Sequence, residues 1–161
     1  MTDLTYTFRY RVWNIHGWSP YSNTISILCS TWPAQPTSAP AVAVSDSINV
    51  LITWLKPDDG GNYISAYKIF IQKIDGSFSQ ELTNCDGSLS STVTNWQCLI
   101  PMSVLWASPF NLVKDSNVIV KYSAINILGE SDLSPESGTP YIKITTIPNT
   151  PSSSPIILSY S

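Results

Sequence analysis

Apolar and polar residues alternate in three segments of the chain, strictly in the first of them, which is the pattern of a β-strand with one buried face. The segments are residues 4–12, 47–54 and 118–124. Their apolar positions are Leu4, Tyr6, Phe8, Tyr10 and Val12; Ile48, Val50, Ile52 and Trp54; and Val118, Val120, Tyr122 and Ala124. The pattern predicts that each listed set faces a hydrophobic core.

Turn-forming sequences separate these segments. PDDGGN occupies residues 57–62, DGS residues 75–77 and NILGES residues 126–131. Residues 66–74, AYKIFIQKI, are rich in β-branched and aromatic side chains and predict a further strand. One short helical turn is expected at residues 102–107. The whole pattern predicts an all-β, antiparallel fold.

An internal repeat organises the chain. YTFRYRVWNIHGWSPYS at residues 6–22 aligns with VIVKYSAINILGESDLS at residues 118–134, so that Asn126 follows Asn14 by 112 positions, as Gly129 follows Gly17. The Pro-rich stretch at 30–40 is echoed at 145–155. Self-similarity at a fixed offset indicates a tandem array. The period suits one β-sandwich of about 100 residues with an insertion.

The repeat predicts three parts. Residues 1–32 are interpreted as the last two strands of a preceding repeat, residues 33–146 as one complete domain, and residues 147–161 as a linker and the first strand of a following repeat. An isolated two-stranded hairpin is marginal in water. The first part is therefore expected to dock on strands supplied by a longer chain or by another molecule.

Two stretches resemble the fibronectin type III family. INVLITWLKPDDGGNYISAYKIFIQK at residues 48–73 resembles strands B and C, with Trp54, Pro57 and Tyr67 in the family's positions. VIVKYSAINILGESDLS resembles strands F and G. The resemblance implies an immunoglobulin-like β-sandwich, with one complete domain flanked by partial repeats. Val118 stands where the family usually has a tyrosine, so we expect apolar packing at that corner.

CLIPMSVLWASPFNL at residues 98–112 resembles versions found in tandem repeats of protist surface proteins. That resemblance, with the abundance of Ser, Thr and Pro, predicts an extracellular or cell-surface setting. Only 12% of the residues are charged, about half of the roughly 25% of an average soluble domain.

The three cysteines are spaced unevenly. Cys85 and Cys98 bound a loop rich in Gly, Ser and Thr. We expect a disulfide between them, which would stabilise the fold by about 3 kcal/mol in the chain-entropy model; the alternative is two buried thiols. Cys29 then remains unpaired or forms an intermolecular bond.

The segment WSPYS at residues 18–22 resembles the WSxWS box of cytokine receptor domains, in which an aromatic ladder stacks with arginines of strand F. The resemblance implies a cation–π stack of Arg9, Arg11, Trp13 and Trp18. A ligand-binding face is one interpretation. The other is an ordinary start of strand G whose stacked side chains stiffen an exposed sheet.

Charge and motif content argue against several classes of protein. The net charge is −3 and basic residues form no patch, so nucleic acid is not an expected partner. No apolar run approaches the ~20 residues of a membrane span. His16 is the single histidine, whereas a catalytic triad or zinc site normally needs a richer set. We therefore predict no enzyme, no catalytic or metal site and no cofactor.

Serines and threonines lie among prolines in both linkers, a composition typical of O-glycosylated segments. The alternative is an unmodified, stiff linker. The candidate positions are Ser30, Thr31, Thr37, Ser38, Thr145, Thr146, Thr150, Ser152, Ser153 and Ser154.

These observations lead to three functional hypotheses. The first is a structural module that assembles end to end into a fibre or stalk, with copies of itself or adjoining repeats as partners. The second is a receptor or adhesion ectodomain that binds a protein ligand. The third is an accessory module of a secreted carbohydrate-active enzyme.

Overall fold

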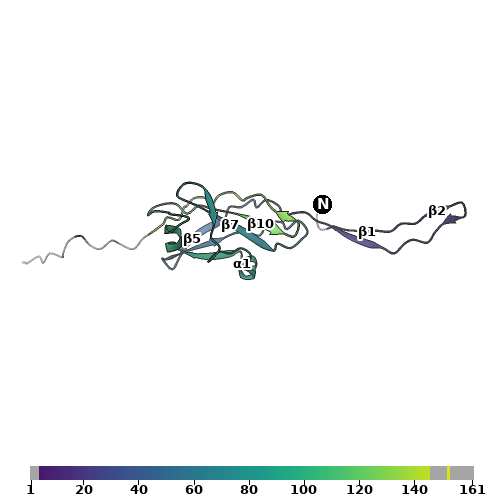
Figure 1. Cartoon of the computed structure of the whole chain (residues 1–161), viewed down its shortest axis with the longest axis horizontal. Helices are drawn as coiled ribbons and strands as arrows, with labels where there is room; N and C mark the ends of the chain where they lie inside the picture. Colours follow the sequence, from purple (N-terminus) through teal and green to yellow (C-terminus); the bar gives the residue numbers. More distant parts are fainter. Residues whose placement is uncertain (1–3, 146–151, 153–161) are drawn as a thin grey trace, which may run out of the picture.

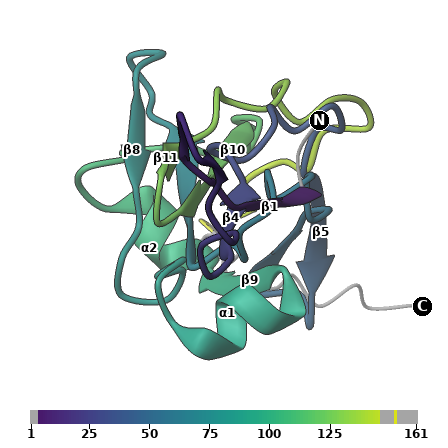
Figure 2. The same cartoon turned by 90° about the vertical axis from the view of Figure 1, so that its right-hand side faces the viewer.

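The computed structural model describes residues 4–145 and residue 152. A β-sandwich forms the main body of the described molecule, and a long hairpin extends away from one of its ends (Figure 1). The predicted partial repeat at residues 147–161 lies almost entirely outside the described residues. Figure 2, viewed from the hairpin end, shows the hairpin in front of the sandwich.

The sandwich consists of two antiparallel sheets. The first sheet has the order β5 (Ala41–Ser45), β6 (Asn49–Thr53) and β9 (Gln97–Pro101). The second has the order β11 (Gly129–Glu130), β10 (Val120–Asn126), β7 (Ala66–Gln72) and β8 (Phe78–Gln80). The register is set by pairs such as Tyr122 with Ile69 and Ile52 with Cys98. The predicted all-β sandwich is confirmed.

Alternation along the strands builds the core between the two sheets. In β6 and β7 every second residue is buried and its neighbours are half-buried, as the period of two requires. The buried side chains from the four main strands are Val50, Ile52, Tyr67, Ile69, Ile71, Cys98, Ile100, Val120, Tyr122 and Ala124. Val118 is also buried, at the corner where apolar packing was expected. The hydroxyl of Tyr122 donates a hydrogen bond to the Leu55 carbonyl at 2.8 Å.

Two short helices flank β9. Helix α2 (Met102–Trp106) lies where a helical turn was predicted. Helix α1 (Ser90–Asn95) falls within the segment that was predicted to be an irregular loop. Its Ser- and Thr-rich sequence carries little helical propensity. The Cys85–Cys98 disulfide closes the loop that contains this helix, and Thr92 of the helix is buried.

The hairpin pairs β1 (Leu4–Phe8) with β4 (Ile25–Cys29) and, nearer its tip, β2 (Trp13–Asn14) with β3 (Gly17–Trp18). The apolar face predicted for residues 4–12 is exposed, because no described segment packs on it. Ile48 is exposed as well, since β6 begins one residue later, at Asn49. In the part of the chain that the structure describes, no helix is long and apolar enough to cross a bilayer.

Candidate functional site

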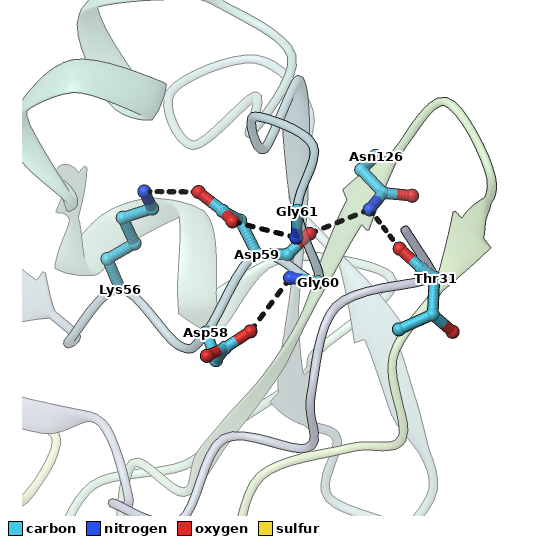
Figure 3. Close-up of polar contacts among 7 residues, drawn as sticks. All are labelled: Thr31, Lys56, Asp58, Asp59, Gly60, Gly61 and Asn126. Carbon is cyan, nitrogen blue, oxygen red and sulfur yellow. Dashed lines mark hydrogen bonds and ion pairs between the residues drawn. The ribbon is translucent and has the colours of Figure 1, made fainter. Parts of the chain in front are cut away.

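The segment between the hairpin and the sandwich is fastened to the loop that follows β6. The Thr31 amide donates to the Gly60 carbonyl at 2.8 Å, and the Ala34 amide donates to the Asp58 carbonyl at 2.9 Å. Figure 3 shows this junction, with Thr31 beside the turn that contains Asp59 and Gly60. The linker therefore follows the surface of the sandwich through main-chain hydrogen bonds before β5 begins.

Asn126, at the end of β10, joins three segments. Its side-chain amide donates to the Thr31 carbonyl at 2.8 Å and to the Asp59 carbonyl at 2.9 Å (Figure 3). Its side-chain oxygen accepts from the amides of Leu128 at 2.8 Å and Gly129 at 3.2 Å. All four hydrogen-bonding positions of the side chain are used, and the residue is 3% exposed.

The close approach at this junction requires glycine. Gly60 has φ +69°, a conformation that residues with a Cβ rarely adopt. A Cβ there would lie 2.5 Å from the Thr31 carbonyl oxygen and 2.6 Å from that of Trp32. The linker could not come this close to any other residue at position 60.

The acidic side chains of this turn accept hydrogen bonds from the backbone of the turn itself. Asp58 accepts from the Gly60 amide at 2.8 Å, and Asp59 accepts from the Gly61 amide at 3.2 Å (Figure 3). The ammonium group of Lys56, 2.8 Å from Asp59, lowers the pKa of that carboxyl. These bonds hold the turn in the shape that meets the linker. Within residues 4–145, no group of three His, Cys, Asp or Glu residues is arranged to hold a metal ion.

Equivalent hydrogen bonds recur in the two copies of the repeat. The Ser19 amide donates to the Val12 carbonyl at 2.9 Å, and the Ser19 hydroxyl accepts from the Val12 amide at 3.1 Å. Ser131 and Ala124, 112 positions later, make the same two bonds at 2.9 and 3.0 Å. A second matched set joins Ser22 to Tyr10 and Ser134 to Tyr122.

Of the cation–π stack predicted for the hairpin, the contact of Arg11 with Trp18 is present, and Tyr21 rather than Trp13 supplies the second ring. The Arg9 guanidinium lies 3.9 Å from the centre of the Tyr21 ring. Arg11 lies 4.3 Å from the Trp18 ring and 4.9 Å from that of Tyr21, and so stacks between them. Trp13 lies opposite Trp18 in the β2–β3 pairing. Tyr21 was missed in the sequence, although its spacing of three from Trp18 matches the two aromatic positions of WSxWS.

The cysteines fall into two environments. Cys85 and Cys98 are buried and joined by a disulfide, with their Cα atoms 5.1 Å apart. Cys29 is a free, exposed thiol at the end of β4, two positions before Thr31.

The candidate glycosylation positions differ in exposure. Ser30 and Thr31 are half-buried at the junction, whereas Thr37, Ser38, Thr145 and Ser152 are exposed. Thr146, Thr150, Ser153 and Ser154 lie outside the described residues. Thr31 takes part in the junction through its main chain.

The two sheets, of three and four strands, form an immunoglobulin-like sandwich, and the linker is hydrogen-bonded to one of its ends. No protein-family model matches the chain. Among curated proteins, mouse fibronectin type-III domain-containing protein 3A is 28% identical over 116 residues, 68% of this chain and 10% of that protein. The human protein of the same name is 27% identical over the same shares. The chain therefore spans about a tenth of the length of these relatives.

Solved structures agree on the fold. Domains of titin superpose with a TM-score of 0.51 at 16% identity, covering 76% of this chain and 36% of that chain. The twitchin kinase region from C. elegans superposes with a TM-score of 0.50 at 18% identity, and the match covers 75% of this chain and 18% of the twitchin chain. The sandwich of this chain is thus similar to fibronectin type III domains, in sequence to the curated relatives and in fold to these structures, in agreement with the resemblance drawn from its sequence.

Proposed function

We infer that this chain is a non-enzymatic spacer from a tandem array of fibronectin type III domains, which holds its neighbours end to end in a fixed orientation. The array would form a fibre or stalk outside the cell or at its surface. The buried disulfide supports this setting, because disulfides persist mainly in oxidising compartments.

The junction carries this inference. A flexible linker would leave its amides to water, whereas this one places Thr31 between the loop at Gly60 and the side chain of Asn126. Pro33 and Pro36, both buried, further restrict its path. A linker held in this way transmits the orientation of one domain to the next.

The hairpin supports the tandem arrangement. Tyr10 is 72% exposed, whereas its counterpart Tyr122 is 1% exposed, although the two make the same hydrogen bonds to a serine. The difference is that Tyr122 is covered by the facing sheet of its sandwich. We interpret the hairpin as strands F and G of a preceding domain whose other strands would cover its apolar face.

Substituting Asn126→Ala should loosen the junction. The change removes two hydrogen bonds to the Thr31 and Asp59 carbonyls, and leaving such groups unpaired costs about 1–3 kcal/mol where they are buried. Spin labels on the native Cys29 and on Lys114→Cys report the position of the linker relative to the sandwich. Pulsed electron-spin resonance should give a narrow distance distribution for the parent chain and a broad one for Asn126→Ala.

The matched control is Asn95→Ala, an exposed asparagine at the end of α1, which should leave the distribution narrow. A broad distribution in the parent chain, or no response to Asn126→Ala, would show that the linker does not set orientation. The spacer function would then be abandoned.

A further inference from the structure

Both copies of the repeat expose an isoleucine at the tip of the turn between their last two strands. Ile15 is 86% exposed and Ile127, 112 positions later, is 83% exposed. Turns at such sites favour Gly, Asn, Asp and Ser, and a β-branched apolar side chain gains nothing there from local structure. The recurrence of the same unfavourable choice suggests that the side chain is buried against a partner.

An apolar pocket lies on the sandwich near the point where the described chain ends. Its volume is about 310 Å³, and its wall is mainly apolar. The residues that shape it come from the turn before β6, from the end of β9, from α2 and from the end of the domain: Ile48, Pro101, Met102, Ser103, Trp106 and Thr145.

The turn and the pocket lie at opposite ends of the same strand. At one end of β10, Asn126 binds the linker that arrives from the hairpin. At the other, Asn117 pairs with Lys143, and the chain continues through the pocket residue Thr145. In a tandem array, the turn of each domain therefore faces the preceding domain, and the pocket of each domain faces the following one. Figure 1 shows the hairpin at one end of the sandwich and β5 toward the other.

We propose that this pocket receives the exposed turn isoleucine of the following fibronectin type III repeat, a second copy of this domain placed head to tail. The inference rests on the proposed tandem function and names the contact between its units. Ile127 is exposed here because the described part of the preceding repeat consists of its last hairpin and lacks the segments equivalent to 47–48 and 101–106. Ile15, at the far tip of the hairpin, is free to enter the pocket of another chain.

Disulfide trapping between whole chains tests the contact. In a Cys29→Ser background, chains carrying Ile15→Cys are mixed with chains carrying Ser103→Cys and oxidised with copper–phenanthroline. Ser103 is an exposed pocket residue. The mixed disulfide, identified by peptide mapping, should form at least tenfold faster than with two controls. These are Thr24→Cys, elsewhere on the hairpin, and Ile74→Cys, in an exposed turn of the sandwich.

Adding Ile48→Asp to the Ser103→Cys chain should abolish the rate difference, because it places a charge in the apolar wall. Equal rates for Ile15→Cys and both controls would overturn the proposal. So would a rate difference that appears only after truncation at residue 145, since the chain's own C-terminal segment would then be the occupant. A narrow spin-label distribution alongside either result would leave the spacer function standing and refute the pocket contact alone.

Discussion

At the scale of single residues, the junction depends on a few side chains that sequence patterns do not distinguish from their neighbours. Gly60 and Gly76 both lie in turns and both have positive φ, +69° and +83°. A Cβ at Gly76 would meet no atom within 4 Å, whereas at Gly60 it would collide with the linker. Comparing alanine at the two positions therefore separates the cost of the left-handed backbone conformation from the cost of the clash with the linker.

Gly60→Ala should therefore destabilise the chain more than Gly76→Ala. The left-handed conformation alone costs roughly 1–2 kcal/mol for a residue with a Cβ, and this is the whole effect expected at Gly76. At Gly60 the clash with the Thr31 carbonyl should add about as much again. Urea denaturation of the two variants measures both costs. Equal losses would mean that the linker moves away freely.

At the scale of elements, the segment between β8 and β9 carries a short helix where the sequence favours an irregular loop. The segment contains α1, and a disulfide joins Cys85, which precedes the helix, to Cys98 on β9. Cys98 lies opposite Ile52 in the β6–β9 pairing, so the disulfide fastens the irregular segment directly to a core strand. The bond therefore closes the loop in which α1 lies.

Reducing this disulfide should lower the free energy of unfolding by about 3 kcal/mol, because the unfolded chain regains the freedom lost when two residues 13 positions apart are joined. Thermal unfolding with and without reductant in a Cys29→Ser chain measures the effect. Cys29→Ser alone should change nothing, since Cys29 is exposed and unpaired in the structure. An unchanged melting temperature on reduction would contradict the expected role.

At the scale of the whole molecule, two hairpins with the same local hydrogen bonds differ in everything that surrounds them. The hairpin at residues 4–29 has its broad faces exposed, whereas β10 lies inside a four-stranded sheet over a packed core. Two strands alone are marginally stable in water. The same local strand pattern therefore occurs twice, but among the described residues only the second copy packs on a hydrophobic core.

Amide hydrogen exchange should reveal this difference directly. The amides of Tyr10 and Tyr122 both donate to a serine hydroxyl, at 3.1 and 3.0 Å. In the chain of 161 residues, the Tyr10 amide should exchange at least about a thousandfold faster than the Tyr122 amide. Exchange at Tyr10 requires only opening of the hairpin, whereas exchange at Tyr122 requires global unfolding. Similar rates, measured by NMR, would mean that the hairpin is stable without a neighbouring domain.

Much of the architecture could be predicted from local signals. The alternation in residues 47–54 and 118–124 and the turn residues between strands indicated the sandwich, and the fixed offset of the repeat aligned Asn14 with Asn126. Helix α1 could not be predicted in this way, because its Ser- and Thr-rich sequence favours a loop and the helix forms within the segment closed by the Cys85–Cys98 disulfide. Trp18 was predicted as a partner of the arginines, but Tyr21 was missed, since it meets Arg9 and Arg11 only when the two arms of the hairpin lie side by side.

The sequence by itself determined the strand periodicity, the sandwich class and the repeat, because side-chain alternation and turn chemistry act over a few neighbouring residues. The tertiary structure alone decided which apolar faces are buried and where the linker is bound. Those outcomes depend on segments distant in sequence, such as Thr31, Gly60 and Asn126, meeting at hydrogen-bonding distance.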